Sequence, residues 1–354
     1  MLNFRTKTIV ILSLLFSMFV IFACTAEETS SNSGSGSNTL ATIIDRGELV
    51  CGVNDNLTGF GVVNSAGQFE GFDIDFCKAV AAAILGDAGK VEYVPLTASA
   101  RFEALAANEI DILIRNTTWT ASRDRDLGND FTAPTFYDGQ GMMVKASSGY
   151  DSIEAMEGAT VCVLQGTTTE LNLDDRFTGM DYTPLTFETN DPLQAAYEEG
   201  RCDGWTTDKS GLASKRAGFS TPSDHVVLAE TLSKEPLGPL TRDNDSELYD
   251  VVQWVVFGMM QAEESGITSS NVTSMASNPS DPGMARLLGV GFDGGEPSDF
   301  GFGIDVNFMQ NVISQVGNYG EVYERHLVPL GLTREGSLNA QWTDGGLIYA
   351  PPFR

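Results

Sequence analysis

A polar turn followed by an arginine is the strongest chemical signal in the sequence. Residues 116–120 read NTTWT, and Ser122 and Arg123 follow directly. A guanidinium bonds a carboxylate through two parallel hydrogen bonds, and hydroxyls and free backbone N–H groups can bond its other lone pairs. The stretch therefore predicts a site for a small carboxylate. The alternative is a capped loop in which Arg123 pairs with a neighbouring Asp.

The elements around this turn predict that it lies at a strand end. Residues 110–114 form an apolar run typical of a buried strand, and Ser122 is expected to cap the helical turn that carries Arg123. Earlier strands are expected at 48–53 and 91–95, with a helix capped by Asp73 and another at 100–107. This alternation predicts a parallel α/β sheet, in which ligands bind at the carboxyl ends of strands.

A second α/β pattern begins after Gln140. Strands are expected at 160–164, within 181–187 and at 202–206, with a helix at 192–199 and a Gly turn at 165–170. The third of these strands ends at Thr207 and Asp208, which places a carboxylate at a strand end. Two α/β units with polar loops at their strand ends predict a cleft between them.

The last third of the chain is predicted to be mostly helical. Helices are expected at 248–264, capped by Asp245 or Ser246, and at 308–326, with an interruption near 317–320. The length of 354 residues predicts two domains, and the net charge of −27 argues against nucleic acid and anionic membrane surfaces as partners. No Walker-type phosphate loop or metal-ligand cluster is found, so no cofactor or metal is expected.

The beginning of the chain indicates export. Arg5 and Lys7 precede an apolar run at 9–23 that ends in IFAC, which resembles a bacterial lipobox with Cys24 as the acylated residue. Residues 1–24 are thus expected to be a lipoprotein-type signal peptide and residues 25–38 a flexible tether. The alternative is an uncleaved anchor helix. In both cases the folded part lies outside the cytoplasm, in the periplasm or at the cell surface.

Four segments, read in order, resemble the solute-binding proteins of amino-acid ABC transporters. They are residues 67–84, 115–124, 161–173 and 200–211, and the tail after residue 318 is similar to the general L-amino-acid-binding type. The resemblance implies an α/β, two-lobed, type II clamshell with a hinge and a mainly helical C-terminal extension. Residues 39–138 and 233–354 are expected to form lobe 1 and residues 139–232 lobe 2, with crossings near 136–140 and 230–234.

Apart from Cys24, the sequence has four cysteines, which allow three pairings. Export permits disulfides, and metal binding is disfavoured because there is no Cys-x-x-Cys and only His225 and His326 are available. The pairing Cys51–Cys77 and Cys162–Cys202 is preferred because each bond then stays within one lobe.

The resemblance also implies how the two ends of a ligand are held. Arg123 matches the arginine that binds the ligand α-carboxylate, and Thr168 matches the residue that donates a backbone N–H to it. Asn116 and Thr118 match positions that line the pocket, although Asn116 departs from the commoner Gly or Ser. Asp208 matches the acid that binds the α-ammonium. Arg123 and Asp208 belong to opposite lobes, so a bound ligand would favour the closed state.

The expected side-chain pocket differs from that of the glutamate- and aspartate-binding relatives. Arg101 matches an arginine that contacts the side-chain carboxylate there, whereas Asn54 replaces a second arginine. The alternative for Arg101 is pairing with a protein carboxylate. A single arginine predicts broad specificity. The apolar wall is expected to include Leu57, Phe60, Trp119 and Tyr137, with packing at the lobe interface as the alternative for Trp119.

These observations predict a protein that captures free L-amino acids and delivers them to the permease subunits of an ABC transporter. We expect a monomer attached to the membrane through a lipid anchor, with no nucleic acid partner. One alternative is a dehydratase of the cyclohexadienyl or arogenate type on the same fold, although neither histidine lies in a cleft motif. The other is a ligand-sensing subunit for a receptor.

Overall fold

A short helix opens the part of the chain that the computed structural model describes, residues 38–354. Helix α1 (Thr39–Arg46) begins at Asn38, whose side chain accepts a hydrogen bond from the N–H of Ala41. Asn38 therefore belongs to the folded part and not to the tether, and the sequence analysis did not predict α1. The predicted signal peptide, Cys24 and the rest of the tether lie outside the described residues.

The three strands predicted for the first sheet are parallel, but the sheet as a whole is mixed, because it also contains strands that were not predicted. Its strand order is β5 (Val91–Pro95), β1 (Leu49–Val53), β6 (Ile112–Leu113), β14 (Leu240–Arg242) and β7 (Asn129–Phe131). β5, β1 and β6 are parallel, but β14 is antiparallel to both of its neighbours. β6 is shorter than the expected strand at 110–114. The chain between β1 and β5 forms a small antiparallel sheet of β2 (Asn56–Leu57), β3 (Gly61–Val63) and β4 (Phe69–Glu70).

The second sheet contains the strands predicted after Gln140. Its order is β10 (Thr183–Phe187), β9 (Thr160–Leu164), β11 (Gly204–Asp208), β8 (Phe136–Lys145) and β12 (His225–Val227). β9 has the predicted bounds. β8 was not predicted as a strand, and it runs antiparallel to β11 and β12.

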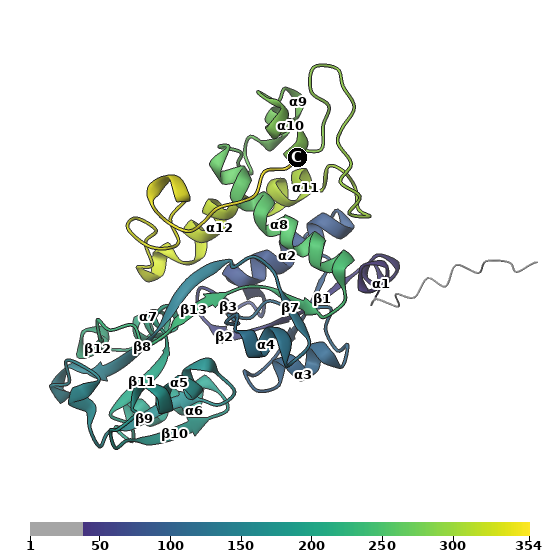
Figure 1. Ribbon diagram of the computed structural model, residues 1–354. Helices are drawn as coiled ribbons and strands as arrows, with labels where there is room; N and C mark the ends of the chain where they lie inside the picture. Colours follow the sequence, from purple (N-terminus) through teal and green to yellow (C-terminus); the bar gives the residue numbers. More distant parts are fainter. Residues whose placement is uncertain (1–37) are drawn as a thin grey trace, which may run out of the picture. The chain divides into compact units, whose positions relative to one another are not determined.

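Two paired strands connect the sheets. The first half of β8 pairs with β13 (Lys234–Leu237), with Asp138 opposite Glu235 and Gly139 opposite Lys234. β8 follows β7 of the first sheet along the chain, and β13 is followed by β14 of the same sheet. The predicted crossings near 136–140 and 230–234 fall at or beside this pair, and Figure 1 shows the long β8 ribbon running from one sheet to the other.

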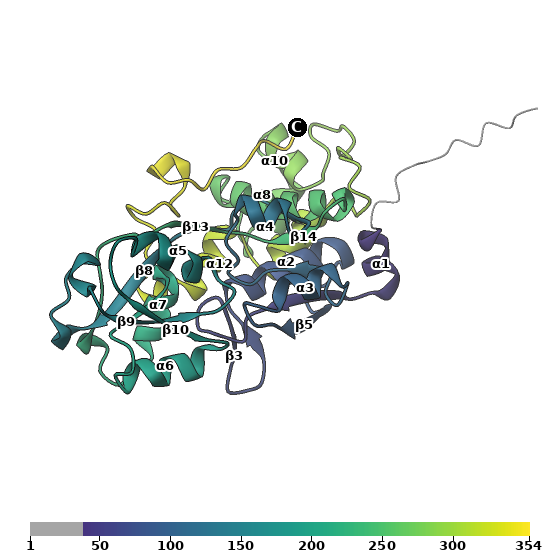
Figure 2. The same ribbon diagram turned by 60° about the horizontal axis from the view of Figure 1, so that its bottom comes forward.

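The helices are short except for α2 (Phe72–Leu85) and α8 (Ser246–Glu264). In the last third, α9 (Val272–Ser277), α10 (Pro282–Leu287), α11 (Phe308–Gln315) and α12 (Tyr319–His326) gather around α8 (Figures 1 and 2). The predicted interruption near 317–320 is confirmed, because Asn318 caps α12 with a capping box. Asp245 occupies the N-cap of α8 without a side-chain hydrogen bond.

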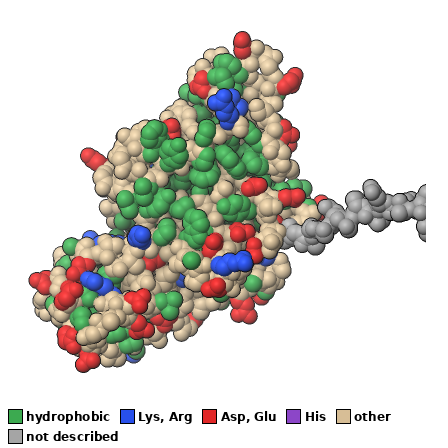
Figure 3. Space-filling view, viewed as in Figure 1, with side chains coloured by type: hydrophobic (Ala, Val, Ile, Leu, Met, Phe, Trp, Pro, Cys, Tyr) green, Lys and Arg blue, Asp and Glu red, His purple; other side chains and the backbone are tan. Residues whose placement is uncertain are grey.

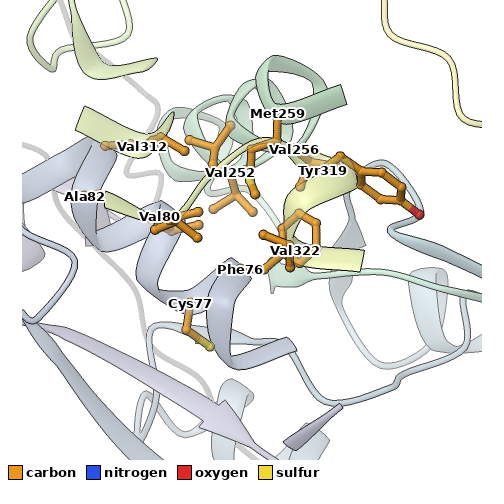
Figure 4. Packing of buried hydrophobic residues seen from close by; sticks show 14 of the residues in the cluster. Phe76, Cys77, Val80, Ala82, Val252, Val256, Met259, Val312, Tyr319 and Val322 are labelled. Atoms are coloured by element: carbon orange, nitrogen blue, oxygen red, sulfur yellow. The ribbon is translucent and has the colours of Figure 1, made fainter. Parts of the chain in front are cut away.

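The largest apolar core lies between α2 and the C-terminal helices. Phe76 and Val80 of α2 pack in one buried cluster with Val252 and Val256 of α8 and with Val312 of α11 (Figure 4). Each such side chain contributes roughly 1.5–3 kcal/mol by leaving water. The C-terminal extension therefore fixes α2, the helix that follows the first strand.

Both predicted disulfides are confirmed. Cys51 in β1 is bonded to Cys77 in α2, and Cys162 in β9 is bonded to Cys202, just before β11. Each bond thus connects elements around the same sheet.

Two predicted helix caps are wrong. The N-cap of α2 is Gly71, whose φ of 140° suits glycine, and Asp73 lies in the first turn of the helix. The helix α4 (Ala121–Arg125) is capped by Thr120, whose hydroxyl accepts the N–H of Arg123, and not by Ser122. In both cases the capping position lies two residues earlier in the chain.

Candidate ligand-binding site

A polar cavity lies where the loops of the two sheets meet. From the first sheet it is lined by the loop after β1, by α3 (Arg101–Ala106) and by the turn after β6. From the second sheet it is lined by the ends of β9 and β11 and by the starts of α5 (Thr168–Arg176), α6 (Asn190–Glu198) and α7 (Lys209–Ala217). The predicted site residues among its lining are Asn54, Leu57, Arg101, Asn116, Thr118, Thr168 and Asp208.

The turn after β6 is held by a buried carboxylate. Asn116 has a φ of 31°, and its N–H donates to Oδ2 of Asp73 at 2.7 Å. The Nδ2 of Asn54 donates to Oδ1 of Asn116 at 3.0 Å. Burial raises the pKa of Asp73 to about 7, although the Asn116 N–H and the charge of Arg115 lower it. Asp73 therefore positions the ligand-facing turn, a role that its place in the sequence did not reveal.

Asp208 supplies a carboxyl group that forms no ion pair within 4.0 Å in the part of the chain that the structure describes. It ends β11, is only 7% exposed and receives a hydrogen bond from the Asn116 side chain. Burial raises the pKa of Asp208 well above its ordinary value, and the nearby carboxylates of Asp138 and Glu235 raise it further. A cation placed beside Asp208 would stabilise its ionised form. The Asn116 side chain, which the sequence left without a role, thus links Asn54 to Asp208.

Two buried arginines, Arg101 and Arg115, line the same cavity. Nη1 of Arg101 donates to the carbonyl of Arg115 at 3.3 Å and to the hydroxyl of Thr117 at 3.2 Å, while its Nε has no hydrogen-bond partner. Burial lowers the pKa of Arg101 well below its ordinary value, as do the charges of Arg123 and Arg115. No ion pair within 4.0 Å among residues 38–354 includes either arginine. Arg101 is therefore not neutralised by a protein carboxylate.

Arg123 lies in a recess next to the cavity. Its Nη1 donates to the carbonyl of Thr118 at 3.0 Å and its Nη2 to that of Gly166 at 3.5 Å. Burial lowers the pKa of Arg123, and the charges of Glu235 and Asp208 raise it. Within the described chain no carboxylate forms an ion pair with Arg123 either, so it is not paired with a neighbouring Asp.

A threonine pair separates Arg123 from the cavity. The hydroxyls of Thr118 and Thr168 lie 3.4 Å apart, and Thr168 lines both the cavity and the recess of Arg123. Thr168 begins α5, directly after the N-cap Thr167, and its hydroxyl donates to Glu235 at 2.7 Å. The first turn of α5, where backbone N–H groups have no acceptor within the helix, therefore borders the cavity.

Several predicted residues do not reach the cavity. Phe60 is fully buried in the core against Phe72 and Phe136. Trp119 and Tyr137 line a separate apolar recess together with Leu347 and Tyr349 of the C-terminal segment. Many apolar side chains are visible over the helical part of the protein (Figure 3). Of the expected apolar wall, only Leu57 lines the cavity.

Sequence reasoning missed four charged residues around the site: Asp73, Arg115, Asp138 and Glu235. Arg115 stands in a segment that carried the resemblance, and this was its only signal. Asp138 and Glu235 face each other on the strands that connect the sheets. Burial raises the pKa of Asp138 to about 6, while hydrogen bonds from Ser210 and Gly139 lower it.

Residues 38–354 contain no group of three or more His, Cys, Asp or Glu side chains placed to hold a metal ion. The histidines are engaged elsewhere: His225 contacts the hydroxyl of Tyr197, and His326 contacts Asp75. The geometry is that of a binding cavity between two α/β sheets, with charged groups of both signs and no histidine among its lining residues.

The chain belongs to the bacterial extracellular solute-binding proteins, family 3, which it matches over residues 49–267. It is 48% identical over 325 residues to the glutamate/glutamine/aspartate/asparagine-binding protein BztA of Rhodobacter capsulatus, covering 90% of this chain and 94% of that protein. It is 46% identical over 327 residues to the general L-amino acid-binding periplasmic protein AapJ of Rhizobium johnstonii, covering 91% of this chain and 94% of that protein.

Solved structures agree with this family. An ABC transporter periplasmic binding protein from Brucella ovis with glutathione bound has a TM-score of 0.84 and 46% identity, covering 89% of this chain and 99% of that one. The type II periplasmic-binding-protein fold is thus confirmed. The curated relatives are binding proteins and not enzymes, so the protein is an extracytoplasmic solute-binding protein, and the dehydratase alternative has no support.

Proposed function

We propose that the protein captures L-amino acids, with broad specificity, and delivers them to the permease of an ABC transporter. The observation that carries this proposal is the cavity in which, among residues 38–354, neither Asp208 nor the buried arginines form an ion pair. An amino-acid zwitterion supplies both missing charges at once. The names of BztA and AapJ, which are amino-acid-binding proteins, support the same ligand class.

In the proposed binding mode, the α-ammonium lies between Asp208 and the carbonyl of Asn116. The α-carboxylate accepts the N–H of Thr168 at the start of α5 and approaches Thr118. In this structure Nη1 of Arg123 donates to the carbonyl of Thr118 at 3.0 Å. Arg123 would complete the site by rotating its side chain so that the guanidinium bonds the ligand carboxylate in place of that carbonyl. Arg101 and Asn54 then face the ligand side chain.

We further propose that the ligand closes two lobes with the predicted bounds, 39–138 with 233–354 and 139–232. β8 and β13 would act as the hinge, because they are the strands that pass between the sheets. Arg123 and Asp208 belong to different lobes, so both bind the ligand only in the closed state. Each charge-assisted bond contributes roughly 1.5–3 kcal/mol to that state.

The beginning of the chain leads to a further proposal about attachment. The lipobox-like sequence before Cys24 supports a lipoprotein anchored through that residue after removal of a signal peptide, and we propose that the protein acts as a monomer. In the region that the structure describes, no helix has the length and apolar character to cross a membrane. The intact mass of the mature protein tests the proposal: acylation at Cys24 supports it, and a retained residue 1–23 segment contradicts it.

A thermal-shift panel of the twenty amino acids tests the ligand class, and calorimetry of variants tests the site. We expect several amino acids to stabilise the protein, and Arg123→Ala or Asp208→Ala to weaken binding by at least tenfold. Arg176→Ala is the control, because Arg176 pairs with Glu154 on the surface. If no amino acid stabilises the protein, the function is refuted. If one alone does so, the broad specificity is refuted.

A further inference from the structure

The cavity carries more positive than negative charge. Arg101, Arg115 and Lys215 line it, whereas Asp208 is its one lining carboxylate among the described residues. Lys215 donates to Oδ1 of Asn56 at 2.8 Å, a neutral partner, so this bond does not cancel the positive charge of Lys215. An ordinary zwitterion brings one charge of each sign and would leave this excess unchanged.

Arg115 is the cation whose donors are least used. Its side chain is buried, with the residue only 6% exposed, and its single hydrogen bond runs from Nε to the carbonyl of Leu96 at 2.7 Å. Neither Nη atom has a hydrogen-bond partner within residues 38–354, although a guanidinium carries four N–H groups there. The Nη atoms are not among the buried polar atoms that lack a partner in residues 38–354, so they remain open to solvent and can bind an anionic ligand group.

The nearest protein carboxylates do not take that place. Asp73 and Asp55 are the acids whose charges act most on Arg115, yet neither forms an ion pair with it within 4.0 Å among the described ion pairs. Asp73 instead accepts the N–H of Asn116. The free Nη groups of Arg115 are therefore available to a ligand.

Arg115 also lies at the junction of two spaces. Beyond the cavity is an outer recess, and the two share Asn54, Arg115, Leu164 and Asn190 in their linings. The recess also carries three acids, Asp55, Glu188 and Asp191. Since these would repel an anion, a carboxylate is expected at Arg115 itself, and the recess is left for neutral parts of a ligand.

We propose that Arg115 binds a second carboxylate of the ligand, so that this site prefers amino acids that carry a carboxylate beyond the α-carboxylate. The inference rests on the proposed function, because it takes the α-ammonium and α-carboxylate as already held by Asp208 and by the Thr168 and Arg123 side. Arg101 lies beside Arg115, whose carbonyl it bonds, and strengthens the positive field there.

Two sources could supply the second carboxylate. It can end a short side chain, as in glutamate, or end a γ-linked peptide that passes through the recess, as in glutathione. The Brucella ovis relative holds glutathione. The acids of the recess favour the short side chain, so we expect L-glutamate to bind more tightly than glutathione.

The test is calorimetry with three ligands: L-glutamate, L-glutamine and glutathione. L-glutamine has the shape of L-glutamate, but its side chain is uncharged. The proteins are wild type, Arg115→Gln, Arg115→Lys and the surface control Arg176→Gln. We expect the wild type and the control to bind glutamate at least tenfold more tightly than glutamine. We expect Arg115→Gln to reduce this ratio at least tenfold, and Arg115→Lys, which keeps the charge, to retain part of it.

The outcomes of this experiment separate the possibilities. The proposal is overturned if the wild type binds glutamine as tightly as glutamate. It is also overturned if Arg115→Gln weakens the binding of both ligands equally, so that the ratio of their affinities is unchanged. If Arg115→Gln does not fold, Arg115→Lys and the wild-type ratio still decide. If glutathione binds more tightly than glutamate and depends on Arg115, the second carboxylate comes from a peptide. Failure to bind any amino acid refutes the proposed function itself.

Discussion

Replacing Asp208 with Asn should have opposite effects on ligand binding and on the stability of the ligand-free protein. The substitution keeps the shape of the side chain but removes the charge that is proposed to hold the α-ammonium. Asp208 is 7% exposed, so little solvent screens this interaction. A charge-assisted hydrogen bond contributes roughly 1.5–3 kcal/mol, which corresponds to a loss of affinity of about 10-fold to 150-fold.

The ligand-free protein should not lose stability with this substitution. Burial and the neighbouring carboxylates of Asp138 and Glu235 raise the pKa of Asp208, which means that its charged form is unfavourable without a ligand. An amide avoids this repulsion and can still bond the side chain of Asn116. We therefore expect the melting temperature without ligand to stay the same or to rise at neutral pH.

Calorimetry with L-glutamate and thermal unfolding without ligand measure the two effects in Asp208→Asn. Asp151→Asn is the matched control, because Asp151 is exposed and does not line the cavity. An affinity within threefold of the wild type would refute the role of Asp208 in binding. A melting temperature that falls together with the affinity would show that Asp208 acts through the fold.

Three further predictions concern protons and covalent bonds. Ligand affinity should fall as the pH is lowered, because burial raises the pKa of Asp208 in the free protein and a bound ammonium would lower it; calorimetry in buffers of different ionisation enthalpy should show proton release on binding. Burial raises the pKa of Asp73 to about 7, so the ligand-free protein should lose stability as the pH rises from about 4 to 7, because only the unfolded state releases this proton there; Asp73→Asn should remove that part of the slope in thermal unfolding. Each disulfide closes a segment of 26 or 40 residues, and replacing either Cys pair by Ser should lower the free energy of unfolding by roughly 3 to 4 kcal/mol in denaturant titrations. An affinity that does not change with pH would contradict the first prediction. A pH slope in Asp73→Asn equal to that of the wild type would contradict the second, and an unchanged free energy of unfolding in a Cys-to-Ser variant would contradict the third.

Local patterns predicted the elements that local interactions determine. The apolar run at 160–164 is the strand β9, and the Gly-containing break near residue 317 separates α11 from α12. β14 could not be found in this way, because residues 240–242 pair with strands about 110 to 130 residues earlier and have no pattern of their own. This insertion made the first sheet mixed.

In the site, too, the residues within local motifs were predicted and the contacts between distant residues were not. Asp208, Asn116, Thr118 and Thr168 were predicted from matched motifs, and the structure brings them around one cavity. The partner of Asn116 was not predictable, because the carboxylate of Asp73 reaches it from 43 residues away and is used there instead of at a helix cap.

Arg115 was missed for a related reason. Its sequence neighbourhood does not show that its Nη groups face a cavity whose other wall comes from residues beyond 160. Burial without an ion pair among residues 38–354 is a property of the folded molecule, and it distinguishes Arg115 from the arginines that form ion pairs on the surface.

A crystal structure of the protein with L-glutamate tests the central claim most directly. We expect the α-ammonium within about 3 Å of the Asp208 carboxylate, and the α-carboxylate on the N–H of Thr168 and the guanidinium of Arg123. Glutamate bound outside this cavity, or bound within it without contact to Asp208 and Arg123, would contradict the account.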